Sequence, residues 1–156
     1  MNDTQKIKYI NKAGIIAAIY CVLTIVMGSL SFGQVKGVEF RISEVMTILP
    51  FFIPEAIPGL FVGCFLANII GGLGPVDFIF GSLTTLAAAY LTSKMPNKYL
   101  AILPPVLLNA FIVSIWVSKF TGLPYFVNVG TIGFGEFVTA GIGGIILASA
   151  YERISK

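Results

Sequence analysis

Long apolar stretches, separated by short joints with proline, glycine or lysine, follow one another along most of the chain. Their length and pattern predict helices over six ranges. The predicted helices are Ala13–Phe32, Ile42–Ile53, Ala56–Gly72, Val76–Ser93, Leu100–Phe120 and Gly135–Tyr151. A straight crossing of a bilayer needs roughly 20 apolar residues, so the second range, which contains Pro50, is predicted to be kinked or partly re-entrant. No linker divides the ranges, so residues 1–156 are predicted to form one domain.

Composition and charge place these helices in a membrane. Hydrophobic residues make up 56% of the chain and charged residues 11%, which is typical of an integral membrane protein. Seven lysine and arginine residues fall on the side of both chain ends and three on the other side, and the richer side is expected to be cytoplasmic. We therefore predict an all-α bundle of six transmembrane helices with cytoplasmic N- and C-termini and a basic tail over residues 1–12. This charge distribution does not predict nucleic-acid binding.

Carboxylates near the other membrane surface are candidates for a binding site. Charges near hydrocarbon are costly unless they face protein, water or a ligand. Glu44, Asp77 and Glu136 each lie near the start of a predicted helix, where an acid also stabilises the helix end. Three of them on one surface favour a shared acidic pocket. Arg41 either pairs with Glu39 or Glu44, or joins that pocket.

Amides and aromatic side chains extend this candidate site. Asn68 and Asn109 lie deeper in apolar helices, where helix-to-helix hydrogen bonds or a ligand would satisfy them. Trp116 follows on the predicted fifth helix, and the loop predicted after it contains Tyr125 and Asn128. Such groups suit a flat, nitrogen-rich ring, with stacking on its face and hydrogen bonds to its edge. The alternative is that the aromatic residues form a belt at the membrane interface.

Several chemistries are not expected of this chain. It contains no histidine, so a histidine-based triad or a zinc site of the usual composition cannot be built. It also lacks a glycine-rich run ending in Gly-Lys-Ser or Gly-Lys-Thr that would bind ATP. Cys21 and Cys64 lie in apolar runs and are expected to be buried as hydrophobic residues. We predict a binding protein that is not an enzyme and has no cofactor or metal.

Small residues recur at four-residue spacing on several predicted helices. On the first helix, Ala13, Ala17 and Cys21 form one ridge, and Gly14 with Ala18 forms a second beside it. Ridges of this kind let two helices approach closely in lipid. On the other helices they predict internal packing. On the first helix, internal packing and the docking of a partner helix both remain open.

Three runs of the sequence carry a resemblance to a known family. They are Arg41-Ile42-Ser43-Glu44, the glycine-rich run Gly59–Gly72, and Asp77–Leu83. A small six-helix membrane protein with these runs resembles the substrate-binding S components of energy-coupling-factor (ECF) transporters. Within them, it is most similar to the queuosine-precursor family QueT. The spacing of Ala13 and Ala17 is similar to the alanine motif by which S components dock on their coupling subunit.

The resemblance implies a cargo and partners. An S component in a bacterial plasma membrane would capture a 7-deazaguanine base or queuine from outside. It would deliver the base inward with a transmembrane coupling subunit and two ATPase subunits. Glu136 or Glu44 would hold the guanine-like edge and Asp77 a cationic amine, while Trp116 or Tyr125 would stack on the ring. The predicted binding residues are Arg41, Glu44, Asn68, Asp77, Asn109, Trp116, Tyr125, Asn128 and Glu136; the predicted docking residues are Ala13, Gly14, Ala17, Ala18 and Cys21.

Two other functions fit the sequence. One is an S component for a different vitamin, such as folate or pantothenate, although a largely acidic pocket does not suit an anionic vitamin. The other is an oligomeric channel or an assembly protein outside transport, in which the small-residue ridges would serve self-association.

Overall fold

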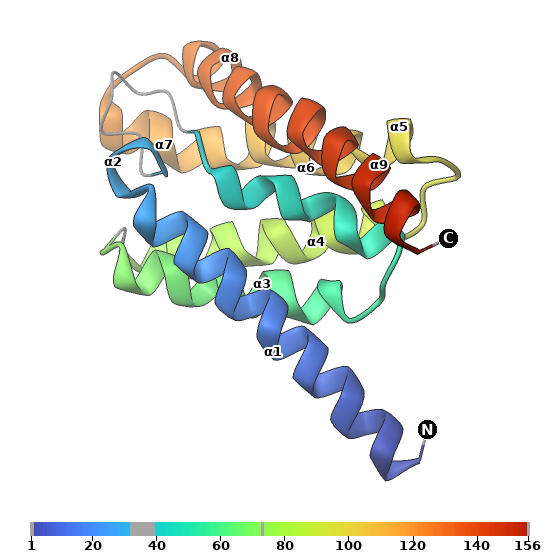
Figure 1. The fold of residues 1–156 in the computed structure, drawn as a ribbon. Coiled ribbons are helices and arrows are strands. Elements are labelled where there is room, and N and C mark those ends of the chain that lie inside the picture. The colour runs from blue at the N-terminus through green and yellow to red at the C-terminus, as the bar shows by residue number, and fades with distance from the viewer. Residues whose placement is uncertain (1, 32–39, 73, 156) are drawn as a thin grey trace.

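The computed structural model describes residues 2–31, 40–72 and 74–155, and the regular structure within them is helical (Figure 1). Each of the six predicted ranges contains helix. The elements are α1 (Asp3–Val26), α2 (Gly28–Ser31), η1 (Ile42–Phe51), α3 (Ala56–Ile70), η2 (Asp77–Gly81), α4 (Ser82–Thr92), α5 (Lys98–Ala101), α6 (Leu103–Leu108), η3 (Asn109–Val113), α7 (Ser114–Thr121), α8 (Tyr125–Glu136), η4 (Phe137–Gly143) and α9 (Gly144–Ile154). Of these, η1 is a 3-10 helix, and η2, η3 and η4 are π-helical turns that continue into neighbouring α-helices.

Three helical stretches in the described residues are long and apolar enough to cross a bilayer. They are Asp3–Val26, Lys98–Thr121 and Tyr125–Ile154, where the second and third each join several elements end to end. The second predicted helix is short, as its sequence indicates. A 3-10 helix rises about 2 Å per residue, so the ten residues of η1 reach about 20 Å, less than the roughly 30 Å of hydrocarbon. The long apolar stretches make the chain a membrane protein.

The first helix begins ten residues earlier than predicted, so most of the segment expected to be a basic tail is helical. Asp3–Lys12 forms the first turns of α1. The side chain of Asn2 accepts a hydrogen bond from the backbone N–H of Gln5 (2.9 Å), and the Gln5 side chain accepts one from the N–H of Asn2 (3.0 Å). This reciprocal cap starts the helix in the polar segment. Polarity had suggested a tail, but lysine and glutamine are also good helix formers.

The last helix also begins ten residues earlier than predicted, at Tyr125 rather than Gly135. The loop expected over residues 121–134 is reduced to a short turn around Gly122, which has φ +72° and ends α7. Glycines between Tyr125 and Glu136 had suggested a loop, but glycine is frequent in transmembrane helices. Glu136 therefore lies inside a 30-residue helical stretch and does not open a helix.

Around η1, the helices pack as one bundle (Figure 1). η1 contacts α1, α3, α4 and α9, so it lies at the centre of the described structure. α1 crosses one side of the bundle and its N-terminal half extends beyond the other helices, while α8 and α9 run along the opposite side. The N- and C-terminal ends lie toward the same side of the view.

Among the described glycines, the closest approach to the backbone of another helix joins α3 to α1. A Cβ atom added to Gly59 would lie 2.8 Å from the backbone oxygen of Ala13, and one added to Gly63 would lie 2.8 Å from that of Ala17. These distances are far inside ordinary van der Waals contact, so the two backbones touch because both positions are glycine. The backbone at Ala13 and Ala17 thus packs against α3, whereas Gly14 beside it is exposed.

Candidate functional site

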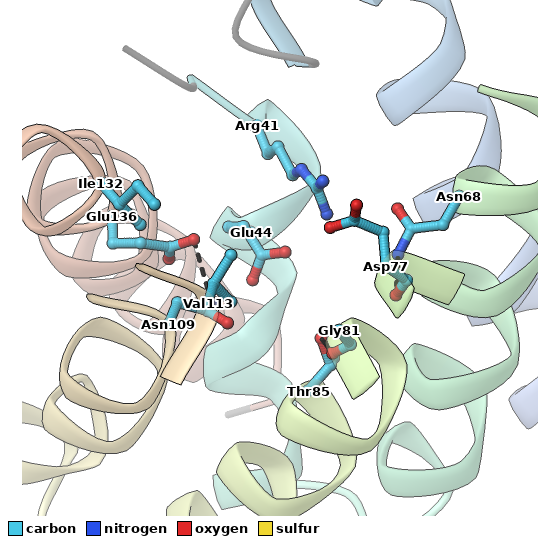
Figure 2. Close-up of a pocket in the computed structure, with 10 residues that line it drawn as sticks. All are labelled: Arg41, Glu44, Asn68, Asp77, Gly81, Thr85, Asn109, Val113, Ile132 and Glu136. Atoms are coloured by element: carbon cyan, nitrogen blue, oxygen red, sulfur yellow. Dashed lines mark hydrogen bonds between the residues drawn. The ribbon is translucent and has the colours of Figure 1, made fainter. Parts of the chain in front are cut away.

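A polar cavity lies where η1, α3, η2, α4, η3 and α8 converge (Figure 2). Its lining includes six of the nine predicted binding residues, among them Arg41 and Glu136, which are the first and the last of the nine along the chain. The lining residues are Arg41, Glu44, Asn68, Asp77, Gly81, Thr85, Asn109, Val113, Ile132 and Glu136. Side chains more than 90 residues apart in sequence therefore meet at one place.

The cavity has two ends with different chemistry. At one end the guanidinium of Arg41 points toward the carboxylate of Asp77, with Asn68 beside it (Figure 2). Glu136 and Asn109 form the other end (Figure 2). The carboxylate of Glu44, whose side chain is buried, lies between them. The arrangement presents acidic groups along the whole length of the cavity.

Two of the carboxylates are each held by a neutral donor from another helix. The indole Nε1 of Trp116 donates a hydrogen bond to Oδ1 of Asp77 (2.8 Å). The amide Nδ2 of Asn109 donates one to Oε1 of Glu136 (3.0 Å). A hydrogen bond to a charged group is stronger than one between neutral groups, so each of these bonds fixes the direction of a carboxylate without neutralising it.

Glu44 is held in the same way from α1. The hydroxyl of Tyr20 donates a hydrogen bond to Oε1 of Glu44, and both side chains are buried. Next to this pair, Oγ1 of Thr24 is hydrogen-bonded to the hydroxyl of Ser43 (2.7 Å). The first turn of η1 therefore takes its position from α1, although no α1 residue lines the cavity.

Asn68 contributes an acceptor to the cavity. Its Nδ2 donates to the backbone oxygen of Asp77 (3.1 Å) and contacts Sγ of Cys64 (3.5 Å). Its Oδ1 is buried and has no hydrogen-bond partner among the described residues. A buried amide oxygen without a partner is unfavourable, so this atom is suited to accept an N–H from a bound molecule.

The π-helical turns coincide with the cavity. Asp77 and Gly81 are the first and last residues of η2, Asn109 and Val113 are those of η3, and Glu136 directly precedes η4. A π-helical turn adds a residue to the helical repeat and changes where the following side chains point, and such turns are frequent at functional sites. Here they direct polar side chains of apolar helices inward.

The cavity is narrow in this structure. Its volume is about 20 Å³, which is enough for one or two water molecules. Pockets for small organic ligands usually have volumes of about 300–1,000 Å³. A ring-sized ligand therefore requires the lining side chains, or the helices that carry them, to move apart.

Comparison with known proteins identifies the family. A family model described as QueT transporter matches residues 10–153, which is nearly the whole chain and includes every cavity residue. The chain belongs to the QueT transporter family. A relative from Lactococcus lactis subsp. cremoris (strain MG1363), named queuosine precursor transporter QueT, is 27% identical over 158 residues that cover 90% of each chain. No solved structure matches the chain.

Membership in the QueT family confirms the resemblance inferred from the sequence. The family is a transporter family, so the role of this chain is in transport, and the three runs that carried the resemblance are all within the match. The first run contributes Arg41 and Glu44 to the cavity. The run Asp77–Leu83 contributes Asp77 and Gly81, and the run Gly59–Gly72 contributes Asn68. The resemblance was therefore carried largely by the elements that form the cavity.

Three predicted binding residues do not line the cavity of this QueT family member. Trp116 lies behind Asp77, which it holds. Tyr125 donates its hydroxyl to the backbone oxygen of Phe111 (2.9 Å), and Nδ2 of Asn128 donates to that of Leu123 (3.2 Å). The expectation that Tyr125 and Asn128 lie in a loop is wrong, because both belong to α8. The described residues that line the cavity include no aromatic side chain.

Four lining residues were not predicted from the sequence: Gly81, Thr85, Val113 and Ile132. Val113 and Ile132 are apolar residues in apolar helices, so nothing in their identity distinguishes them from lipid-facing positions. Gly81 and Thr85 belong to a small-residue ridge on the fourth predicted helix, which had been assigned to internal packing. That ridge indicated a smooth helix face but not that a cavity lies against it.

A second hollow, which is apolar, lies between α1 and α3. Its volume is about 310 Å³. Its lining residues are Tyr9, Ile10, Ala13, Gly14, Ala17, Pro58 and Val62. Three of the five predicted docking residues are among them; of the other two, Ala18 is exposed and Cys21 is buried. We call this surface the α1–α3 groove.

Proposed function

We propose that this QueT family member is the substrate-binding S component of an ECF importer and that it captures a queuosine precursor from the outer side of a bacterial plasma membrane. In this proposal residues 1–156 form one domain with six transmembrane helices and cytoplasmic termini. The name of the Lactococcus relative supports the cargo. The excess of lysine and arginine on the side of the chain ends supports the orientation.

The observation that carries the proposal is the meeting of Glu44, Asp77 and Glu136 in one buried cavity with the acceptor Oδ1 of Asn68. Such a cavity suits a molecule with several N–H donors and a positive charge. The guanine-like edge of a 7-deazaguanine base presents a ring N–H and an amine side by side, which one carboxylate accepts as a two-pronged pair. An aminomethyl group on the base adds the positive charge.

The geometry suggests which residue takes which part of the base. Glu136 or Glu44 accepts the guanine-like edge, and Asp77 binds the aminomethyl group in competition with Arg41, which faces it. Asn68 accepts a ring N–H. Val113 and Ile132 then lie against the face of the ring, in place of the aromatic stacking that the sequence predicted from Trp116 and Tyr125.

Delivery into the cell requires partners. The chain contains no ATP-binding run of the P-loop type, so we propose that two separate ATPase subunits supply the energy through a transmembrane coupling subunit. The α1–α3 groove is the surface that we propose for the coupling subunit. It is apolar and open, and small residues along it allow a partner helix to approach closely.

Direct binding to the purified, detergent-solubilised protein tests the proposed cargo. Titration calorimetry would compare 7-deazaguanine bases with and without an aminomethyl group, queuine, guanine, folate and pantothenate. We expect submicromolar binding for the deazaguanines alone. Because Glu136→Gln and Glu44→Gln each remove a charged acceptor, each is expected to weaken binding about 10- to 100-fold.

Glu152→Gln is the matched control, since Glu152 pairs with Lys98 (2.7 Å) far from the cavity lining. It should leave the dissociation constant unchanged. Unchanged affinity in both Glu136→Gln and Glu44→Gln would contradict the site assignment. Tight binding of folate or pantothenate by folded protein would indicate a different vitamin, and a homo-oligomer that binds none of the panel would favour the assembly function.

A further inference from the structure

Tyr20 is a buried residue that touches the candidate site only from behind. It has 0% exposure and belongs to the hydrophobic core that joins α1, η1, α3 and α4. Its hydroxyl is the hydrogen-bond donor to Oε1 of Glu44, and Glu44 lines the cavity whereas Tyr20 does not. A phenol buried in an otherwise apolar core needs a hydrogen-bond partner for its hydroxyl, and here that partner is Glu44.

A second hydrogen bond strengthens this connection between α1 and η1. Thr24, one turn after Tyr20, donates its hydroxyl to the backbone oxygen of Tyr20 (2.9 Å), and its Oγ1 is hydrogen-bonded to the hydroxyl of Ser43 (2.7 Å). Two successive residues of η1 are thus held by two successive turns of α1. The side chain of Arg41, the N-cap of η1, donates to the backbone oxygen of Ser31 (3.1 Å), and the contacts from α1 hold Ser43 and Glu44, which follow it in the first turn of η1.

The other side of Tyr20 rests against the close backbone contact between α1 and α3. A Cβ atom added to Gly63 would lie 2.9 Å from Cβ of Tyr20 and 2.8 Å from the backbone oxygen of Ala17. The Tyr20 side chain therefore extends from the place where α1 touches α3 to the carboxylate of Glu44. Any displacement of α1 away from α3 moves the hydroxyl that holds this carboxylate.

We propose that Tyr20 is a positioning residue of the binding site: its hydroxyl orients Glu44 from α1, so that affinity for the base depends on how α1 is seated against α3. The inference rests on the proposed function for its cargo. A carboxylate that is held from behind presents its acceptor to the ligand in a fixed direction, and such preorganisation increases affinity.

The proposal has a consequence for the α1–α3 groove, because Ala13 and Ala17 of the same helix line it. A molecule that occupies the groove and shifts α1 would also shift Tyr20 and Glu44. By linkage, a base that prefers one position of α1 would change the affinity of the groove for its occupant by the same factor. Base binding and groove occupancy are thus expected to be coupled through Tyr20.

Tyr20→Phe tests the proposal because it removes the hydroxyl and keeps the buried ring. We expect the dissociation constant for the preferred base to rise about 10-fold, the usual cost of one hydrogen bond to a charged group. Tyr99→Phe is the matched control. It makes the same change at an exposed tyrosine of α5 that lines neither the cavity nor the α1–α3 groove, and it should leave the dissociation constant unchanged.

A double-mutant cycle separates positioning from a merely structural role. If the Tyr20 hydroxyl acts through Glu44, adding Tyr20→Phe to Glu44→Gln should weaken binding much less than it does in the native protein. A full, additive loss in the double variant would overturn the proposal. So would an unchanged dissociation constant in Tyr20→Phe alone.

Infrared difference spectroscopy without ligand gives a readout that does not depend on the cargo. The carboxylate band of Glu44 is identified by its loss in Glu44→Gln, and we expect this band to shift in Tyr20→Phe but not in Tyr99→Phe. A band that stays in place would overturn the positioning role. If no base binds the native protein, the proposed cargo fails, yet the band still decides whether Tyr20 orients Glu44.

Discussion

The contact between α1 and α3 and the polar cavity beside it are built in opposite ways. At the contact, Gly59 and Gly63 have no side chain, and the backbone of the partner helix fills the space. In the cavity, long polar side chains from several helices reach toward one another, and each carboxylate is held by a donor from a different helix. The contact between α1 and α3 therefore depends on the small volume of its side chains, and the cavity depends on the charge and orientation of its side chains.

This difference predicts which changes each region tolerates. An added methyl group is serious at the contact because neither backbone has room to move independently. An exchange of a carboxylate for an amide of the same shape is mild for folding in the cavity but serious for binding. Variants that separate stability from affinity would therefore test the comparison most directly.

The largest effect is expected at the contact. Gly63→Val places atoms within 3 Å of both the Ala17 backbone and Cβ of Tyr20, so α1 must move away from α3. Overpacking usually costs about 1–3 kcal/mol and sometimes more, which for a chain of this size corresponds to a melting temperature lower by about 2–12 °C. Thermal unfolding of the variant and the native protein in detergent measures this change in melting temperature. Gly130→Val is the control, since an added Cβ meets nothing within 4 Å there; equal losses in both variants would contradict the close contact.

An intermediate effect, on affinity alone, is expected in the cavity. Asp77→Asn keeps the shape of the side chain but removes the charge proposed to bind the aminomethyl group. The dissociation constant for the aminomethyl base should rise about 10- to 100-fold, while a deazaguanine without the amine should lose much less. Asp3→Asn, at an exposed position, should change neither. An equal loss for both bases would show that Asp77 does not discriminate the amine.

The smallest effect is expected at a native ion pair between α1 and α3. Lys12 and Glu55 form a salt bridge (3.0 Å) between α1 and the start of α3, and the Lys12 side chain is 58% exposed. The backbone N–H of Glu55 and the Lys12 ammonium lower the pKa of Glu55 below its ordinary value of 4.5. A depressed carboxyl pKa means that the stabilisation is present above pH 4.5 and is lost as the pH falls through the lower, folded-state pKa.

Glu55→Gln should therefore lower the melting temperature at pH 7 by no more than about 2–4 °C, because an exposed salt bridge contributes little. The difference from the native protein should disappear in acid, below the folded-state pKa of Glu55. A difference that persists or grows as the pH falls would show that the ion pair is not its source. Glu152→Gln, at the salt bridge with Lys98 (2.7 Å), provides the comparison.

The charged residues of the cavity could be predicted from the sequence, whereas its apolar residues could not. Glu44, Asp77 and Glu136 stand out because charged residues are rare in apolar helices, and all three line one cavity. Val113 and Ile132 also line it, yet they are indistinguishable in sequence from residues that face lipid. In a largely apolar chain, a charged residue can be recognised from the sequence as a candidate for a buried site, whereas an apolar residue cannot.

Hydrogen-bond partners were beyond what the sequence could predict. The pairing of Trp116 with Asp77 depends on the rotation of α7 relative to η2, and a π-helical turn in each helical stretch alters that rotation. Helix starts were also missed where local composition misleads. The polar residues before Ala13 and the glycines before Glu136 suggested a tail and a loop, but both segments are helical because a cap and the flanking apolar residues favour helix there.

The unequal lengths of α1 and α3 have a consequence for the lipid around the protein. At 1.5 Å per residue, the 24 residues of α1 span about 36 Å, whereas the 15 residues of α3 span about 22 Å. Since the hydrocarbon layer is about 30 Å thick, hydrophobic mismatch is expected to thin the bilayer beside α3, whereas the first ten residues of α1, which include Asp3 and three lysines, extend past the hydrocarbon. The protein should therefore sit in an asymmetric lipid collar, and acyl-chain length should influence how α1 lies against α3.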